Sequence, residues 1–165
     1  MKPVRTRSLK LILPVLTIAW CLFIFAMSAT PAIKSSQLSG SGVELIAQTV
    51  VPDYNEKNIS EQIEITETIH LIIRKLAHFT EFGILGVLLA ADIFLWWAPP
   101  KILLLTISFL LGSIYAASDE FHQRFVPGRS CELRDALIDS AGVLCGVALS
   151  VFVITAITRI SVKQK

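Results

Sequence analysis

Residues 102–120 read ILLLTISFLLGSIYAASDE, which is a run of seventeen positions without a charged side chain that ends at two adjacent carboxylates. A helix needs about 20 predominantly apolar residues to cross the ~30 Å hydrocarbon layer of a bilayer. Similar apolar runs occur at residues 9–28, 76–97 and 136–158, and the quoted stretch supplies another at residues 102–121. We therefore predict an all-α integral membrane protein whose residues 1–165 form one domain of four transmembrane helices.

The composition of the chain agrees with this prediction. Of its 165 residues, 53% are hydrophobic and 17% are charged, whereas soluble domains carry about 25% charged residues. The run at residues 76–97 is the weakest of the four, because it contains His78, Glu81 and Asp92. The first run also fits a signal peptide. Its apolar core is longer than the roughly 7–15 residues of a cleaved signal, so we predict an uncleaved anchor.

Basic residues at the two ends of the chain predict its orientation. Lys2, Arg5, Arg7 and Lys10 precede the first run, and Arg159, Lys163 and Lys165 follow the fourth. Flanks rich in lysine and arginine stay in the cytoplasm, and an even number of spans places both ends on one side. We predict a multi-pass protein of the bacterial cytoplasmic membrane with both termini cytoplasmic. Three arginines before the fourth span argue against this orientation, but they alternate with carboxylates and are expected to be paired.

The segment at residues 32–73 is predicted to lie outside the cell membrane, between the first two spans. Residues 34–42 are rich in serine and glycine, which is typical of a flexible linker. Residues 41–44, SGVE, match a capping box at the start of a short amphipathic helix that ends before Pro52. A further helix is predicted to begin near Ser60 and to continue into the second span.

Ionisable residues of three spans are predicted to lie at one depth. Counted at ~1.5 Å per residue from the cytoplasmic ends, His78, Asp119 and Asp139 lie about 27–30 Å away, near the outer surface. An ionisable group within a span costs ~2.5–3.5 kcal/mol on insertion scales, so a polar network explains these residues better than accident does. Gly142 and Gly146 continue the face of Asp139 as a G-x-x-x-G pattern, which lets another helix approach closely.

Some neighbouring residues also have purely structural interpretations, and these stay open. Glu132 and Asp135 suit the positive N-terminal end of the fourth helix. Arg124 and Arg129 suit lipid phosphates at the membrane surface, because long basic side chains extend to that level. Asp92 lies about one turn from the cytoplasmic tryptophans, and we assign it to water there rather than to a site.

Three motifs resemble those of the VanZ-like membrane proteins. Residues 74–82, RKLAHFTEF, are similar to a first motif in which a basic residue precedes a histidine and an acidic residue. Residues 119–129, DEFHQRFVPGR, resemble the most distinctive motif, and Asp135, Asp139 and Gly142 resemble the trailing one. Many members have Asn at the position of Asp139, and Tyr where this chain has Phe82. The resemblance covers residues 20–151 and implies a family associated with low-level teicoplanin resistance, without an assigned reaction.

The residue pattern and the resemblance together define a candidate binding site at the outer end of the bundle. Its members are Arg74, Lys75, His78, Glu81, Asp119, Glu120, His122, Gln123, Arg129, Arg134, Asp135 and Asp139, while Gly142 and Gly146 are assigned to helix packing. We expect Arg129 or Arg134 to neutralise the carboxylates of this site. We predict no cofactor and no metal, because the chain has no Cys/His metal spacing and no H-E-x-x-H motif.

Two functions stay open. In the first, the site binds a membrane lipid headgroup, a lipid-linked cell-wall precursor or a lipoglycopeptide antibiotic, since guanidinium groups make bidentate contacts with phosphate. In the second, the protein is an intramembrane hydrolase or transferase in which His78 and nearby carboxylates ligate a metal or supply a general base. A homo-oligomer is compatible with both, and no nucleic-acid partner is expected. Transport is disfavoured, because four helices offer too little wall for a substrate path.

Overall fold

The computed structural model describes residues 4–129 and 131–163, and these residues are helical with short connections. The elements are α1 (Val4–Ser28), α2 (Ala32–Val50), the 3-10 helix η1 (Tyr54–Glu56), α3 (Ile59–Trp97), α4 (Lys101–Gln123) and α5 (Leu133–Lys163). The described part of the chain contains no strand, so the prediction of an all-α fold is confirmed.

Four helices of the described chain are long and apolar enough to cross a membrane. Their spans are Ser8–Ser28, Ile59–Trp97, Lys101–Gln123 and Leu133–Ile160, which contain or overlap the four predicted ones. Large apolar side chains, such as those of Leu11, Ile114 and Phe152, are exposed on the outside of the bundle. In water this exposure would be unfavourable, whereas in a bilayer these side chains face lipid. The chain is therefore a multi-pass membrane protein.

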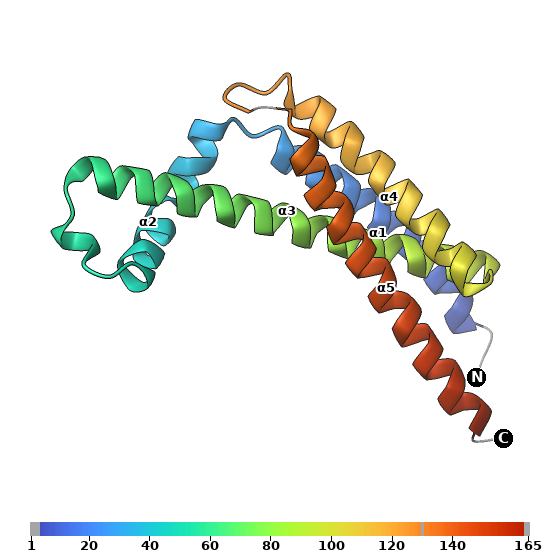
Figure 1. Cartoon of the computed structure of the whole chain (residues 1–165). Helices are drawn as coiled ribbons and strands as arrows, with labels where there is room; N and C mark the ends of the chain where they lie inside the picture. The colour runs from blue at the N-terminus through green and yellow to red at the C-terminus, as the bar shows by residue number, and fades with distance from the viewer. Residues whose placement is uncertain (1–3, 130, 164–165) are drawn as a thin grey trace.

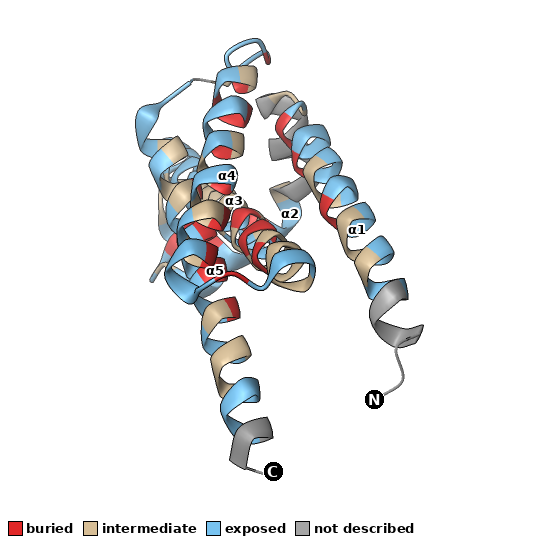
Figure 2. Ribbon diagram, turned by 90° about the vertical axis from the view of Figure 1, so that its right-hand side faces the viewer, coloured by how far each residue is buried: buried red, intermediate tan, exposed pale blue. Residues whose placement is uncertain are grey.

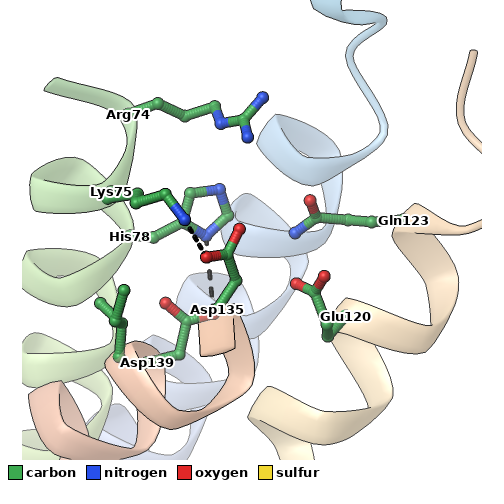
Figure 3. Close-up of a pocket in the computed structure, with 8 residues that line it drawn as sticks. Arg74, Lys75, His78, Glu120, Gln123, Asp135 and Asp139 are labelled. Atoms are coloured by element: carbon green, nitrogen blue, oxygen red, sulfur yellow. Dashed lines mark hydrogen bonds and ion pairs between the residues drawn. The ribbon is translucent and has the colours of Figure 1, made fainter. Parts of the chain in front are cut away.

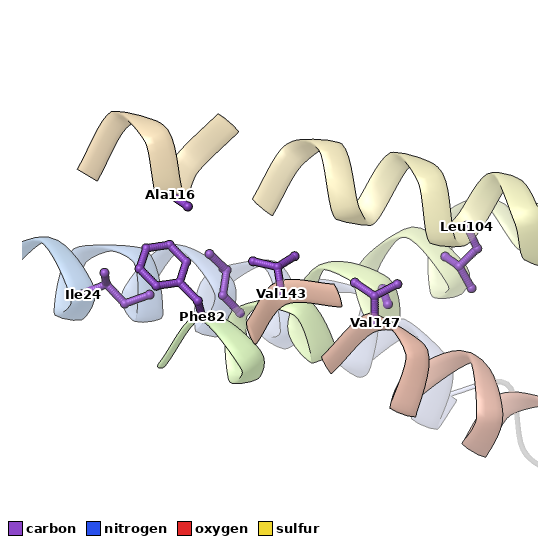
Figure 4. Close-up of a cluster of buried hydrophobic side chains, with 8 residues drawn as sticks. Ile24, Phe82, Leu104, Ala116, Val143 and Val147 are labelled. Carbon is purple, nitrogen blue, oxygen red and sulfur yellow. The ribbon is translucent and has the colours of Figure 1, made fainter. Parts of the chain in front are cut away.

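The helices pack around one apolar core that α1, α3, α4 and α5 share (Figures 2 and 4). Its buried members are Ile24, Phe82, Leu85, Ala90, Leu104, Ala116, Val143 and Val147. Helices α3 and α5 make the closest crossing of the bundle, because glycines stand where they meet. A Cβ atom at Gly142 would collide with the carbonyl group of Phe79, and one at Gly146 with the carbonyl group of Gly83.

Helix α1 is joined to the bundle by polar contacts along its length. The Thr17 hydroxyl donates to the Asp92 carboxylate at 2.5 Å, and the Trp20 indole donates to the carbonyl of Glu81 at 2.9 Å. The Tyr115 hydroxyl donates to the carbonyl of Cys21 at 2.6 Å. Asp92 therefore contacts a neighbouring helix rather than only the water to which the sequence assigned it. Such contacts are expected of a permanent span, and an uncleaved first helix stays our prediction.

The prediction of a flexible linker at residues 34–42 is wrong, because α2 runs without interruption from Ala32 to Val50. The helix begins after Pro31, whose fixed backbone angle suits a helix start. The capping box at residues 41–44 consequently lies inside the helix. Glycine costs an exposed helix about 0.5–1 kcal/mol relative to alanine. Burial of Val43 and Ala47 offsets that cost, and the helix ends before Pro52 as predicted.

Helix α3 is the longest element and reaches beyond the bundle (Figure 1). Its 39 residues begin at Ile59, which confirms that the helix predicted near Ser60 continues into the second span. The Asn58 side chain caps it by accepting a 2.9 Å hydrogen bond from the backbone N–H of Glu61. A helix of this length measures about 58 Å, nearly twice the hydrocarbon layer. Its first turns, with α2 packed against them, therefore project from the membrane.

The start of α1, the end of α5 and the turn between α3 and α4 lie at one end of the bundle (Figure 1). Lys2 and Lys165, which the orientation prediction uses, lie outside the described residues. We expect reporters active only in the periplasm to be active when fused after Ser60 and silent when fused after Pro100, because the basic flanks hold that end in the cytoplasm. Alkaline phosphatase activity would measure this, and activity at Pro100 would invert the orientation.

Candidate functional site

A small cavity lies where α3 leaves the bundle, at the end opposite the α3–α4 turn (Figures 1 and 3). Its lining comes from three helices and consists of Arg74, Lys75, His78, Glu120, Gln123, Asp135, Ile138 and Asp139. Seven of the twelve predicted site residues are among them. The cavity volume is about 10 Å³, which is the space that a single water molecule requires.

An ion pair between α3 and α5 lies at the rim of this cavity. The Lys75 ammonium group donates a hydrogen bond to the Asp135 carboxylate. The two side chains are 28% and 18% exposed, so solvent reaches the pair and screens it. Ion pairs in such positions contribute about 0–1 kcal/mol. Either member can therefore exchange its partner for another charged group at little cost.

A histidine and an aspartate face each other deeper in the cavity. His78 Nδ1 lies 3.9 Å from Asp139 Oδ2, and the two side chains are 13% and 3% exposed. This distance is longer than a hydrogen bond. Phe82 packs against the imidazole ring, with a centroid separation of 6.4 Å. The pair is thus held between two helices with an apolar ring beside it.

The buried carboxylate of Asp119 binds α1 and, through an amide, the loop after α4. Its Oδ2 atom accepts from the Ser28 hydroxyl at 2.7 Å and from Gln123 Nε2 at 3.1 Å. Gln123 Oε1 accepts in turn from Arg129 Nη1 at 3.2 Å. Among the described residues, Arg129 thus forms no direct ion pair with a carboxylate, although its charge lies near those of Asp119 and Glu120. An amide stands between the two charges, because Gln123 lies one helical turn after Asp119.

Arg129 also fastens its loop to the end of α1. Its Nε and Nη2 atoms donate to the carbonyl groups of Thr30 and Met27 at 3.0 and 3.2 Å. Met27 lies in the last turn of α1 and Thr30 just beyond it, where carbonyl groups lack the acceptor role of the helix interior and are available to side-chain donors. Burial lowers the pKa of Arg129, and the nearby Arg74 charge lowers it further. Glu120 fastens the other side of the loop by accepting a 2.7 Å hydrogen bond from the backbone N–H of Glu132.

The remaining predicted site residues lie away from the cavity. His122 stacks on Phe25 of α1, with ring centroids 4.2 Å apart. Glu81 is half-buried beside α1, where its carbonyl group accepts from Trp20. Arg134 is exposed on the first turn of α5. Tyr115, Asp119 and His122 thus share one face of α4, and all three contact α1.

Sequence reasoning omitted Ser28 from the site, although this serine is fully buried and binds Asp119. Serine is common in membrane helices, so its presence gives no signal by itself. Within the described residues, no group of three His, Cys, Asp or Glu side chains is arranged to hold a metal ion.

A comparison with protein families finds one match that covers most of the chain. The family model VanZ/LLP1 matches residues 13–154, which include all the cavity residues. The chain belongs to the VanZ/LLP1 family. This confirms the resemblance drawn from the three motifs. No curated protein and no solved structure gives a significant match.

In the cavity of this VanZ/LLP1 protein, the carboxylates have partners but one of the cations does not. Each of the carboxylates at residues 119, 120, 135 and 139 has a partner within 4 Å. The Arg74 guanidinium extends over the cavity from α3 (Figure 3). Among the described residues, it has neither a hydrogen-bond nor an ion-pair partner. The cavity therefore presents one uncommitted cation above carboxylates that the fold already engages.

Proposed function

We propose that this VanZ/LLP1 protein binds the anionic headgroup of a membrane lipid or lipid-linked cell-wall precursor at the outer end of its bundle. The observation that carries the proposal is the Arg74 guanidinium, which lines the cavity without a partner among the described residues. A guanidinium presents a planar fork of donors that matches two phosphate oxygens. The ligand expected at such a group is a phosphate rather than a cation or an apolar molecule.

Lys75 is the second binding residue of this proposal. Its ammonium group lies one position from Arg74 and holds the partly exposed Asp135 carboxylate. A bound phosphate would replace that carboxylate on Lys75, and solvent that reaches the partly exposed pair would hydrate the released Asp135 carboxylate. The enclosed volume of about 10 Å³ is too small for a headgroup. The headgroup would therefore bind at the rim, with its chains in the adjacent lipid.

An outward site of this kind accounts for the tolerance to teicoplanin-like glycopeptides that the family resemblance implies. The two ligands weighed for this site, a lipid-linked cell-wall precursor and a lipoglycopeptide antibiotic, would meet at that outer surface. A protein that binds either the precursor or the antibiotic at this surface would reduce the amount of antibiotic that reaches the precursor. We therefore propose a contribution to glycopeptide tolerance that depends on Arg74. The cytoplasmic placement of both termini is part of the same proposal, since it turns the cavity outward.

Binding of a short-chain phospholipid tests this function. We expect Arg74→Gln to weaken the affinity of the detergent-purified chain for dihexanoyl phosphatidic acid by about tenfold or more, since a hydrogen bond to a charged group contributes about 1.5–3 kcal/mol. Titration calorimetry would measure the affinity. The matched control is Arg159→Gln, which removes an exposed arginine near the end of α5, away from the cavity, and is expected to leave the affinity unchanged.

Two results would contradict the proposal. One is equal affinity of the Arg74→Gln and unchanged proteins for phosphatidic acid. The other is equal affinity of the unchanged protein for dihexanoyl phosphatidylcholine, whose headgroup carries a compensating positive charge. Arg74→Lys keeps the charge and loses the planar fork, so an intermediate affinity is expected for it.

A further inference from the structure

We infer that His78 and Asp139 form a general-base pair that hydrolyses a terminal phosphate group of a lipid bound at Arg74 and Lys75. This inference rests on the proposed function, because the same two cations hold the phosphate. It adds a reaction to that binding site and assigns a role to the two deepest residues of the cavity. The substrate class is a membrane lipid that ends in a phosphate monoester or a pyrophosphate.

The orientation of the imidazole ring is the first argument. His78 Nδ1 is buried and points at Asp139 Oδ2, 3.9 Å away. The other ring nitrogen points away from Asp139, toward the side of the cavity where Arg74 and Gln123 lie (Figure 3). A carboxylate on one nitrogen holds the proton there and leaves the other free to accept one, as in other enzymes with a histidine base. In unliganded sites such contacts are often longer than a hydrogen bond and tighten when substrate binds.

The arrangement of space and charge is the second argument. The enclosed volume next to His78 is about 10 Å³, the space of a single water molecule. Lys75 lies almost one turn and Arg74 just over one turn before His78 on α3, so both project to the same side of the helix. A phosphate held at the rim by these cations would therefore have its phosphorus next to the water site and the free nitrogen. Fixed cations there also stabilise the charge that develops on the phosphate oxygens.

The reaction needs no reactant other than water. A water molecule in the cavity attacks phosphorus, and a bond forms between its oxygen and phosphorus. The bond between this phosphorus and the departing oxygen breaks, and that oxygen is the alcohol oxygen of a monoester or the bridging oxygen of a pyrophosphate. His78 accepts a proton from the attacking water and returns it to the departing oxygen. A monoester thus gives the lipid alcohol and inorganic phosphate, and a pyrophosphate gives the lipid monophosphate and inorganic phosphate.

The experiment measures phosphate release by the full chain in detergent, with dioleoyl phosphatidic acid and farnesyl pyrophosphate as the probes. We expect the unchanged protein to release phosphate from at least one probe. His78→Ala should lower the rate at least about 100-fold, which is the effect typical of losing a general base. Thr80→Ala is the matched control, because Thr80 is exposed on the same helix and its hydroxyl bonds only its own backbone turn. This control should retain the full rate.

Two further measurements separate chemistry from misfolding. Added imidazole should restore part of the rate of His78→Ala, since it can occupy the space left by the ring, whereas a structural defect would not respond. Asp139 is a positioning residue in this inference, so Asp139→Asn should lower kcat and leave KM unchanged. A rate that is equal in the His78→Ala and unchanged proteins would overturn the inference, and so would a loss that imidazole does not reverse.

Binding of dihexanoyl phosphatidic acid distinguishes failure of the reaction from failure of the proposed function. If the unchanged protein binds this lipid through Arg74 but releases no phosphate from either probe, the hydrolysis is wrong and the binding stands. If the unchanged protein neither binds nor hydrolyses, both are wrong. His78→Ala is expected to bind dihexanoyl phosphatidic acid with nearly unchanged affinity, because Arg74 and Lys75 remain.

Discussion

Replacement of Gly146 by leucine is expected to separate α3 from α5 and to remove most of the folded protein. A Cβ atom at this position would lie against the carbonyl oxygen of Gly83, 2.8 Å from its carbonyl carbon and 3.1 Å from the backbone nitrogen of Val87. These are backbone atoms of a helix, so they cannot rotate away as a side chain would. Overpacking of a well-packed interior typically costs about 1–3 kcal/mol, and displacement of a whole helix costs more.

The melting temperature and yield in detergent, measured by size-exclusion chromatography after heating, would show this effect. We expect Gly142→Leu to behave similarly, because its Cβ would meet the carbonyl group of Phe79. The control is Gly42→Leu in α2, where an added Cβ has no neighbour within 4 Å. That variant should melt like the unchanged protein or slightly higher. Similar melting of all three variants would mean that α3 and α5 do not cross at these glycines.

The G-x-x-x-G pattern illustrates which parts of this fold the sequence can predict. Four spans and one small-residue face follow from composition and spacing, because the bilayer demands long apolar helices and close crossings demand small residues. Helix α2 was not predictable in the same way. Its first half is rich in serine and glycine, and the helix forms because Val43 and Ala47 find a partner surface. Local propensity is overridden there by packing that only the assembled structure contains.

The sequence predicts the level at which the site residues lie along the bundle, but not which side of each helix faces the cavity. Counting residues placed His78, Asp119 and Asp139 at one level, and the structure brings their helices together there. Rotation about each helix axis cannot be counted in this way. On α4, Glu120 and Gln123 face the cavity, whereas Asp119 and His122 lie on the adjoining stripe and face α1. A rotation of about 100°, the angle between consecutive residues of a helix, therefore decides which side chains line the cavity.

Gln123 also explains why Arg129 forms no direct ion pair with a carboxylate among the described residues. Charge alternation in the loop suggests that arginines bind carboxylates directly, and nothing in the sequence shows that an amide will lie between them. An amide can donate to a carboxylate and accept from a guanidinium at once. It therefore connects Asp119 to Arg129 and closes the loop over the end of α1. The pair that does form directly joins Lys75 of α3 to Asp135 of α5, two residues that are 60 positions apart in the sequence.

Asp119→Asn and Arg129→Gln are each expected to destabilise the protein, by about 1–3 kcal/mol, because each leaves a buried polar group without its partner. Asp119 accepts from Ser28 and Gln123, and Gln123 accepts from Arg129, so both substitutions disrupt one chain of hydrogen bonds. Once the first substitution has broken this chain of hydrogen bonds, the second substitution removes fewer stabilising contacts. The double variant should therefore cost less than the sum of the single ones, by about 0.5–3 kcal/mol.

Denaturant titration of the single and double variants in detergent would measure this coupling. Asp119→Asn combined with Arg124→Gln serves as the control cycle, because Arg124 is exposed and contacts neither member of the chain. Its two costs should add within about 0.3–0.5 kcal/mol, as they do for independent sites. If the costs of Asp119→Asn and Arg129→Gln also add within that margin, Asp119 and Arg129 stabilise the protein through independent contacts. The position of the loop over the end of α1 would then be assigned to the hydrogen bonds that the Arg129 side chain donates to the carbonyl groups of Thr30 and Met27.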